Sequence, residues 1–410
     1  MQAGANLPAV GGYNQTVILD AVRRSTEGVS RVELAERTGL SAQTVSNVTR
    51  RLIDDALIVD AGTVVAGVGK PRTILKLQPS GRFAVGVHLD PTVITVVLLD
   101  LASHVVAHRT IPTPESGRAA QTIERILAGV DEVVRTAGID ATRVMGVGIA
   151  APGPVDVASG SVLSPPLLNG WDHVAVRHEL AAGLGMPVLL EKDVTAAAVA
   201  EVWAGHATSR ANLAFFYYGT GVGTGLVLQN EVIRGVSGNA GDIGYLIVRD
   251  QPDAGDAPSA GRRLGNAVLP RRLVQQAIEQ GILPDTGHPL GTEAVREQFG
   301  ALAAAAARGQ ERATALLDAV ARDVATGLVQ LVNLLDLDQV VFGGPFFGPV
   351  AGFMLARIPQ RVLESPEFVV PHSVTFTESA FGEDVAAVGA ACLVLDHAFS
   401  PRPAALLIAR

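Results

Sequence analysis

The sequence predicts two parts, an N-terminal winged helix-turn-helix at residues 1–80 and a larger α/β body with two lobes. Three observations support this fold class. The first eighty residues hold two short amphipathic helices on either side of a glycine, and then two β-rich runs. Two later segments, 83–111 and 212–235, each open with successive strands and lead into alternating helices and strands. At 410 residues the chain has room for two or three domains of roughly 150 residues each.

Composition and charge narrow the class of protein. Hydrophobic residues make up 48% and charged residues 18%, which is enough apolar material for large cores. The formal net charge of -8 argues against a protein that coats nucleic acid along its whole length. Residues 1–80 contain nine Lys/Arg and seven Asp/Glu, a net of +2, which leaves 23 and 33, a net of -10, for the rest. A basic head on an acidic body indicates a DNA-reading module at the N-terminus.

The sequence also predicts a cytoplasmic protein. No apolar run reaches the ~18 residues that span a bilayer, and the start, "MQAGANLPAVGG", lacks the pattern of a secretory signal. The single cysteine, Cys392, lies in an apolar run, where we expect a buried small hydrophobe. One cysteine allows neither a disulfide within the chain nor a thiolate zinc cluster.

The head begins with a helix in "NQTVILDAVRRSTEG", which places Val17, Ile18, Ala21 and Val22 on one face. A short helix follows, with Ser30 and Glu33 at capping-box spacing and Gly39 at its end. In the next helix, Ser41 is the expected N-cap and the apolar positions Val45, Val48 and Leu52 point inward.

The outward face of this second helix suits a DNA reader, because its polar side chains match base edges and phosphates near the helix start. We expect DNA contacts from Ser41, Gln43, Thr44, Ser46, Asn47 and Arg50. The two β-rich runs after it are joined by "GVGKPR", which predicts a wing whose Lys70 and Arg72 touch backbone or minor groove. The alternative is a small helical domain that binds another protein.

The body is predicted to have a first lobe at 81–197, a second lobe at 198–383, and a last helix, 384–398, that packs back onto the first lobe. Strands are expected at about 83–89, 93–100 and 103–111, and long helices near 266–281, 293–307 and 310–335. A further helix begins at Asp193. A bilobed arrangement has a cleft between its lobes, which is a common ligand site.

Four glycines alternate in "YYGTGVGTGLVL": Gly219, Gly221, Gly223 and Gly225. Their spacing matches neither of the two common glycine-rich phosphate loops, which lead into a helix. Here the glycines lie between two strands, so a β-hairpin turn is expected, and its backbone N–H groups can still hold a phosphate. This is the arrangement of actin-like and hexokinase-like ATPases. The alternative is a tight hairpin that needs positive φ.

Taken together, the chain resembles the ROK family of repressors and sugar kinases, over essentially its whole length. The matching pieces are "GVGIAAPGPVD", "GWDHVAVRHELAAGLGMPVLLEKDVTAAAVAE", "YYGTGVGTGLVL", "GNAGDIGY", "QVVFGGPFF" and "AAVGAA". The resemblance implies an actin/hexokinase-like (ribonuclease H-like) body joined to a winged helix-turn-helix, as in the repressor branch.

The departures from the family pattern bear on enzymatic activity. Where family kinases carry D-x-G-G-T-K for ATP phosphate and Mg²⁺, this chain has "HLDPTVI", with His88, Asp90, Pro91 and Val93 at the key positions. Proline removes a backbone donor, and Asp90 places negative charge where phosphate would lie. We therefore expect no kinase activity, no catalytic residues and no use of ATP.

The sugar side is also altered. The family's N-D pair is Lys192-Asp193, and we expect Asp193 to accept sugar hydroxyls while Lys192 favours its ionised form. The G-E-x-G-H run reads Gly241-Asp242-Ile243-Gly244-Tyr245, with no downstream cysteines, so the family's structural zinc is expected to be absent. Leu167 replaces an asparagine, and Trp171 is expected in the core. The ligand-binding residues implied by the resemblance are Gly153, Asn169, Lys192, Asp193, Asn239, Asp242 and Tyr245.

These observations predict a sequence-specific DNA-binding regulator, most simply a repressor, that is controlled by a sugar or sugar derivative in the cleft. Expected partners are a double-stranded DNA operator and a second copy of the chain, as a homodimer or homotetramer, with no membrane partner. One alternative is a regulator whose pocket takes an anionic ligand through Lys192, or that answers to a protein partner. The other is an active sugar kinase.

Overall fold

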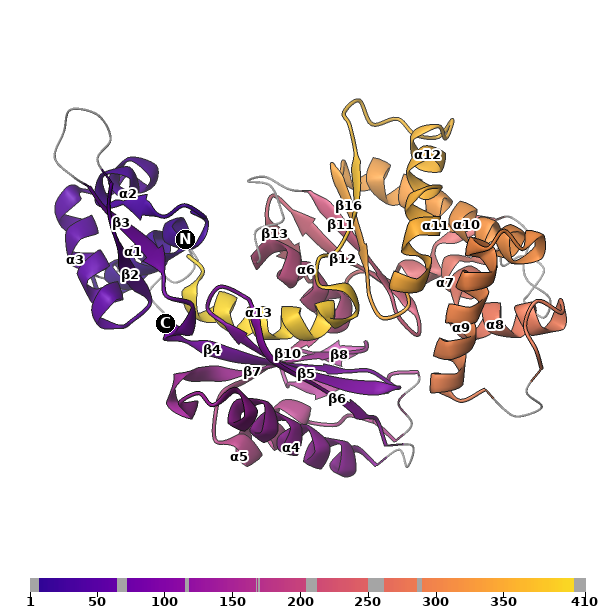
Figure 1. The fold of residues 1–410 in the computed structure, drawn as a ribbon, viewed down its shortest axis with the longest axis horizontal. Coiled ribbons are helices and arrows are strands. Elements are labelled where there is room, and N and C mark those ends of the chain that lie inside the picture. Colours follow the sequence, from indigo (N-terminus) through magenta and orange to yellow (C-terminus); the bar gives the residue numbers. More distant parts are fainter. Residues whose placement is uncertain are drawn as a thin grey trace.

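The computed structural model describes residues 7–64, 72–114, 118–166, 168, 170–203, 212–249, 262–285 and 290–401. It contains a small N-terminal unit, called the head below (residues 7–64 and 72–77), and a body built on two five-stranded sheets (Figure 1). Within the described ranges, none of the helices has the length and apolar character needed to cross a membrane.

The head packs three helices on a small antiparallel sheet of strand order β1-β3-β2. Its elements are α1 (Leu7–Arg23), β1 (Val29–Ser30), α2 (Arg31–Thr38), α3 (Ala42–Asp54), β2 (Ile58–Val64) and β3 (Arg72–Leu77). Ile18, Leu34, Val45, Leu52 and Leu75 are fully buried between them. The hairpin of β2 and β3 confirms the two β-rich runs, while the segment that joins them, with Lys70, lies outside the described residues.

The helix boundaries in the head follow from their caps. Ser30 and Glu33 form a reciprocal capping box, and Gly39 ends α2 in the left-handed region at φ +69°. The Ser41 side chain accepts a hydrogen bond from the Thr44 N–H at 3.2 Å and so begins α3. All three predicted signals are confirmed.

The two body sheets share one plan: a meander of three antiparallel strands, with two parallel strands added beside the first of them. In the first sheet the order is β10 (Val188–Lys192), β7 (Val144–Ala151), β4 (Phe83–Leu89), β5 (Val93–Asp100), β6 (Val105–Pro112). In the second it is β17 (Thr375–Glu378), β16 (Gln339–Gly343), β11 (Leu213–Tyr218), β12 (Val222–Leu228), β13 (Glu231–Ile233).

The outer faces of the two sheets are covered by separate sets of helices (Figure 1). The first sheet packs on α4 (Ala119–Ala137) and α5 (Val176–Leu184). The second packs on α7 (Leu264–Val268), α8 (Pro270–Glu279), α9 (Thr292–Ala307), α10 (Glu311–Leu335), α11 (Ala351–Leu355) and α12 (Ile358–Leu363). Shorter elements are η1 (Pro79–Gly81), η2 (Ala141–Arg143), β8 (Val155–Asp156), β9 (Ser161–Val162), η3 (Ile243–Tyr245), β14 (Ile247–Arg249), β15 (Arg262–Arg263), η4 (Gly348–Val350) and η5 (Gly382–Asp384).

Two helices, α6 (Asp193–Trp203) and α13 (Val385–Phe399), fill the space between the sheets. β11 shows the division between the cores, because alternate side chains of a strand point to opposite faces. Phe216 and Tyr218 join the outer core, while Phe215 and Tyr217 join the cluster around α6 and α13. In that cluster, burial raises the pKa of the Cys392 thiol to about 12, in keeping with the small buried hydrophobe predicted.

Glycines let α13 lie directly on the first sheet. A Cβ on Gly86 of β4 would come within 1.9 Å of the Ala387 carbonyl oxygen, and one on Gly148 of β7 within 1.8 Å of that of Ala390. No real contact is that short, so any larger residue would push the helix off the sheet. The last helix therefore packs back onto the first sheet, as predicted.

Two predicted element boundaries were wrong. The single helix at 266–281 is two helices, since Pro270 begins α8 and the residue before a proline is driven out of the helical region. The third strand starts at Val105 rather than 103, because Asp100 holds a turn by accepting N–H bonds from Ala102 and His104. The predicted boundary at 197/198 falls inside α6, an uninterrupted helix; the domain limits themselves stay a prediction.

Candidate functional site

A cavity of about 560 Å³ lies between the two sheets, at the ends of their central strands. Its walls come from segments of the chain that are distant in sequence, among them the β4–β5 turn, the 152–154 loop, the start of α6, the loops after β11 and β13, and α7. Five of the predicted ligand residues line it, namely Gly153, Lys192, Asp193, Asp242 and Tyr245. Asn169 and the neighbouring Leu167 lie outside the described residues.

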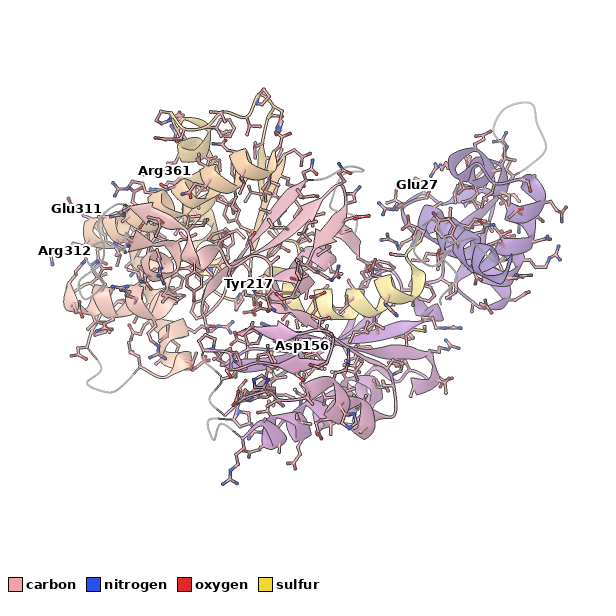
Figure 2. All side chains as sticks on the ribbon, turned by 180° about the vertical axis from the view of Figure 1, so that it is seen from behind. Glu27, Asp156, Tyr217, Glu311, Arg312 and Arg361 are labelled. Atoms are coloured by element: carbon pink, nitrogen blue, oxygen red, sulfur yellow. The ribbon has the colours of Figure 1, made fainter. Side chains whose placement is uncertain are left out.

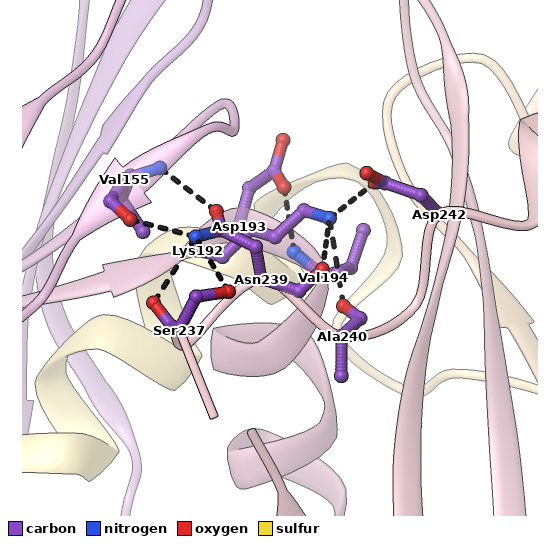
Figure 3. Close-up of polar contacts among 8 residues, drawn as sticks. All are labelled: Val155, Lys192, Asp193, Val194, Ser237, Asn239, Ala240 and Asp242. Atoms are coloured by element: carbon purple, nitrogen blue, oxygen red, sulfur yellow. Dashed lines mark hydrogen bonds and ion pairs between the residues drawn. The ribbon is translucent and has the colours of Figure 1, made fainter. Parts of the chain in front are cut away.

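Lys192, at the end of β10, reaches across the cavity to the loop that follows β13 (Figure 3). Its ammonium donates to the carbonyl oxygens of Asn239 (3.3 Å) and Ala240 (3.5 Å), and it forms an ion pair with Asp242. The Lys192 side chain is only 6% exposed, whereas that of Asp242 is 63% exposed. The charge of Lys192 is thus already matched within the protein, and Asp242 is the partner that faces solvent.

Gly153 makes room for this lysine. A Cβ there would lie 2.9 Å from the Lys192 Cε. The sequence suggested that Gly153 lets a ligand approach the backbone; in the structure its missing side chain accommodates Lys192 first.

Asn239 acts as a clamp between two loops and does not line the cavity. Its side-chain amide accepts a hydrogen bond from the Val155 N–H at 2.8 Å and donates one to the Val155 carbonyl at 2.7 Å (Figure 3). Together with Lys192, it ties the loop after β13 to the first lobe. This residue was predicted to contact ligand, and its position instead suits holding the cavity wall.

A cluster of polar side chains, Tyr217, His88 and Asp193, lies at the start of α6. The Tyr217 hydroxyl and His88 Nε2 are 3.3 Å apart, and Asp193 accepts a hydrogen bond from the Val194 N–H at 2.7 Å. Burial raises the pKa of the Asp193 carboxyl and outweighs the opposing effects of His88 and Lys192. Lys192 does favour the ionised form of Asp193, as predicted, but removal from water is the larger effect and raises the pKa.

Tyr217 keeps its proton for the same reason. Burial raises the pKa of its hydroxyl well above the ordinary value, and the nearby carboxyls of Asp193 and Asp90 raise it further. Figure 2 shows Tyr217 in the middle of the body, in the cluster that surrounds α13. Its hydroxyl is therefore a neutral hydrogen-bonding group on the cavity wall, which sequence reasoning missed because the tyrosine lies in an apolar run.

The two turns that would form a phosphate clamp face the same cavity. Asp90 and Pro91 come from the β4–β5 turn, and Thr220 and Gly221 from the β11–β12 turn. Asp90 is only 6% exposed, and its carboxylate accepts the Thr92 N–H at 2.8 Å. An acidic, proline-containing turn therefore stands where a phosphate would need N–H donors.

None of the four alternating glycines has the left-handed φ that a tight hairpin would require. Two of them serve close packing instead: a Cβ on Gly225 would lie 2.2 Å from the Val194 carbonyl oxygen, and one on Gly223 would lie 2.7 Å from the Val194 side chain. The positive-φ interpretation was wrong, since these glycines let α6 lie against β12.

At the outer edge of the cavity, Tyr245 is 70% exposed and the Arg263 guanidinium lies 5.2 Å from its ring centroid. Arg263 and Asn266 were missed, because nothing in their local sequence distinguishes them from other surface residues.

Trp171 is 2% exposed within the first-lobe core, as predicted. In the described part of the chain, no three His, Cys, Asp or Glu side chains gather as metal ligands would, and the expected lack of zinc stays a prediction.

In the head, α3 exposes a polar face. Gln43, Asn47 and Arg50 are exposed, Thr44 and Ser46 are half-buried, and Gln43 Nε2 donates to Asn47 Oδ1 at 3.1 Å. Ser41 is exposed and occupied as the N-cap, and Arg72 is exposed at the start of β3. Five of the six positions predicted to read DNA thus lie on α3, and Ser41 is its N-cap. Lys70 lies outside the described residues.

Comparison with known proteins identifies the family, because the ROK family model matches residues 84–397. The chain belongs to the ROK family. The ROK body therefore has the actin/hexokinase-like fold predicted from the sequence, with two mixed sheets.

Among curated relatives, a protein named putative xylose repressor, from Caldicellulosiruptor sp. (strain Rt8B.4), is 24% identical over 373 residues, covering 90% of this chain and 92% of its own length. Among solved structures, a ROK family transcriptional regulator, a homologue of the E. coli MLC protein, has a TM-score of 0.76 at 23% identity and covers 95% of this chain and 97% of its own. A ROK glucokinase from Streptomyces griseus, solved with glucose and AMPPNP, has a TM-score of 0.61 at 24% identity and covers 76% of this chain and 98% of its own.

The family model and the two solved structures differ in whether their matches include the head. The ROK model begins at residue 84, after the head, and the glucokinase structure leaves about a quarter of the chain unmatched. The regulator structure leaves only 5%, about 20 of 410 residues, so it has a counterpart for most of the head.

Proposed function

We propose that this protein is a DNA-binding transcription regulator, most simply a repressor, and that its interlobe cavity binds a small sugar-like effector. We also propose that the protein has no kinase activity. The main observation behind the proposal is that one chain contains both a ROK body and a head whose helix α3 exposes a polar face. The similarity to a protein named a xylose repressor, which extends over 90% of this chain, supports it.

The head would act as a winged helix-turn-helix, with α3 in the major groove and the β2–β3 hairpin as the wing. The N-terminal half of α3 offers amide and hydroxyl groups, which suit base edges. As a homodimer or homotetramer in the cytoplasm, the protein would place two heads on half-sites about 34 Å apart.

DNA binding is tested with a duplex selected from a random library, and the binding is measured by fluorescence anisotropy against a scrambled duplex. Asn47→Ala should lower the discrimination between the two by about 1–3 kcal/mol, since a base contact is lost. Lys70→Ala should weaken binding to both duplexes about equally and flatten the salt dependence. If the two variants exchange these effects, the assignments of reader and wing are wrong; if wild type selects no sequence, the proposal fails.

The absence of kinase activity is proposed from the β4–β5 turn, where Asp90 and Pro91 line the cavity opposite Thr220 and Gly221. The test is a coupled assay for ATP-dependent phosphorylation of D-xylose and D-glucose, with an authentic glucokinase as the positive control. Turnover that follows the purified protein through two columns would contradict the proposal.

A neutral sugar suits the cavity better than an anionic one. Lys192 is already paired with Asp242, and the carboxyls of Asp90 and Asp193 also line the walls. Carboxyls accept hydrogen bonds from hydroxyls but repel anions. Thermal shift with D-xylose, D-glucose and D-glucuronate separates the classes, because a ligand raises stability by mass action; stabilisation by the acid alone would favour the anionic alternative.

A further inference from the structure

Besides the packing of α1 against α13, two attachments fix the head to the body, and the first is the chain itself. Residues 78–82 lead directly into β4 of the first sheet. This segment is closely packed. The Leu101 N–H donates to the Pro79 carbonyl at 3.0 Å, and a Cβ on Gly81 would lie 2.0 Å from the Ala56 carbonyl oxygen. This attachment is a tight joint between the head and the first lobe.

The second attachment is a single arginine at the end of α1. Arg23 places its guanidinium 4.2 Å from the centre of the Trp203 ring and donates a hydrogen bond to the Trp203 carbonyl. Its other partner is Asp20, at 2.7 Å, and the Arg23 side chain is 11% exposed. Trp203 is the last residue of α6, where the carbonyl end of the helix dipole attracts a cation.

The other end of that helix is in the cavity. Asp193 and Val194, the first two residues of α6, line the cavity wall, and Lys192 directly before them reaches across to the loop after β13. At 1.5 Å per residue, the eleven residues of α6 span about 16 Å between the cavity and Arg23.

α6 is also packed so that it cannot move alone. On one side Gly225 of β12 meets the Val194 backbone, and on the other a Cβ on Gly389 of α13 would lie 1.8 Å from the Ala196 carbonyl oxygen. β12 belongs to the second sheet, and α13 lies on the first. A change in the angle between the sheets must therefore shift α6 relative to β12, to α13 or to both.

We propose that α6 and Arg23 transmit the state of the cavity to the head. The head is jointed to the first lobe at residues 78–82 and held by Arg23 to a helix that also packs on the second lobe, so a change in lobe angle turns the head about its joint. This inference rests on the proposed function, because an effector acts only through its different affinity for two such states.

The test perturbs the cavity end and observes the head end. In a Trp171→Phe background, Trp203 is the only tryptophan and reports directly on its contact with Arg23. Lys192→Met keeps the methylene packing against Gly153 and removes all three polar contacts across the cavity. We expect Lys192→Met to change the emission and acrylamide quenching of Trp203. Unchanged Trp203 fluorescence would overturn the proposal.

The second arm measures the dissociation constant for the selected DNA duplex. Lys192→Met should change it on the order of fivefold or more, and in Arg23→Ala that change should shrink to about twofold or less, the range of independent sites. Arg24→Ala is the matched control, because Arg24 pairs with the same Asp20 at 2.8 Å from a 45% exposed position; it should retain the full change. Arg23→Lys, which loses the planar stacking, replaces Arg23→Ala if circular dichroism shows the latter unfolded.

An equal effect of Lys192→Met with and without Arg23 would refute transmission through this contact. The two arms also separate this inference from the proposed function. If the wild-type protein binds no DNA, the proposed function fails, while the Trp203 fluorescence still decides whether the cavity and the head contact are linked.

Discussion

The packing of α6 against β12 makes a sharp prediction at Gly225. In Gly225→Ala the added Cβ would lie 2.2 Å from the Val194 carbonyl oxygen and 2.7 Å from the Ala198 Cβ. Ordinary contacts are about 3.5–4.0 Å, so α6 would have to retreat by about 1 Å. It cannot do so freely, because Ala196 on its other side touches Gly389. We expect a loss of about 1–3 kcal/mol in the free energy of unfolding, as for other overpacked cores.

The assay is urea unfolding followed by circular dichroism, with the midpoint compared at constant slope. Gly221→Ala is the matched control, since it lies in the same glycine run, has nothing within 4 Å of an added Cβ and has no left-handed φ. It should change stability by no more than about 0.5 kcal/mol. Equal losses in the two variants would show that the run needs glycine for its turn conformation, and that close packing of α6 is not the reason.

Three further outcomes follow from the structure. Ser30→Ala should lower head stability by about 1 kcal/mol because it removes the capping box, and an unchanged head melting curve would contradict this. Burial raises the pKa of Asp193 above 3.8, so the folded protein binds its proton more tightly and stability falls as pH rises from 3.8 to that raised pKa. Asp193→Asn should therefore become more stable than wild type as pH increases from 4 to 8 in urea titrations, and a constant difference would refute the sign. For Asp140 the sign and the pH range both differ, because hydrogen bonds from Thr142 lower the pKa of that exposed carboxyl below 3.8. Asp140→Asn should therefore lose stability relative to wild type as pH rises from the lowered pKa to 3.8.

Local signals in the sequence determined the head and most of the body elements. The Ser30 capping box, Gly39 and the Ser41 N-cap fix their helices through contacts within four residues, so the pattern predicts them. The strands at 83–89 and 93–100 were also predicted to the residue, because β-branched runs bounded by a turn are local features. The motifs shared with the ROK family then allowed the overall fold of these elements to be predicted.

The site depended on contacts that no local pattern contains. The sequence placed Lys192 and Asp242 in one pocket but could not show that they pair with each other, or that Asn239 holds Val155 and leaves the cavity wall to other residues. It gave the direction in which Lys192 shifts the pKa of Asp193, but not the larger and opposite effect of burial, which depends on the whole fold.

The glycines of "YYGTGVGTGLVL" illustrate the same division. The sequence by itself determined that a hairpin forms there, since two β-rich runs and the short turn between them are features of the local sequence. Only the tertiary structure decided why Gly223 and Gly225 are required, because the atoms that exclude a side chain belong to α6, some thirty residues earlier in the chain. In the same way, the contact between Arg23 and Trp203 joins residues 180 positions apart, and such pairings are set by how the two lobes and the head pack together.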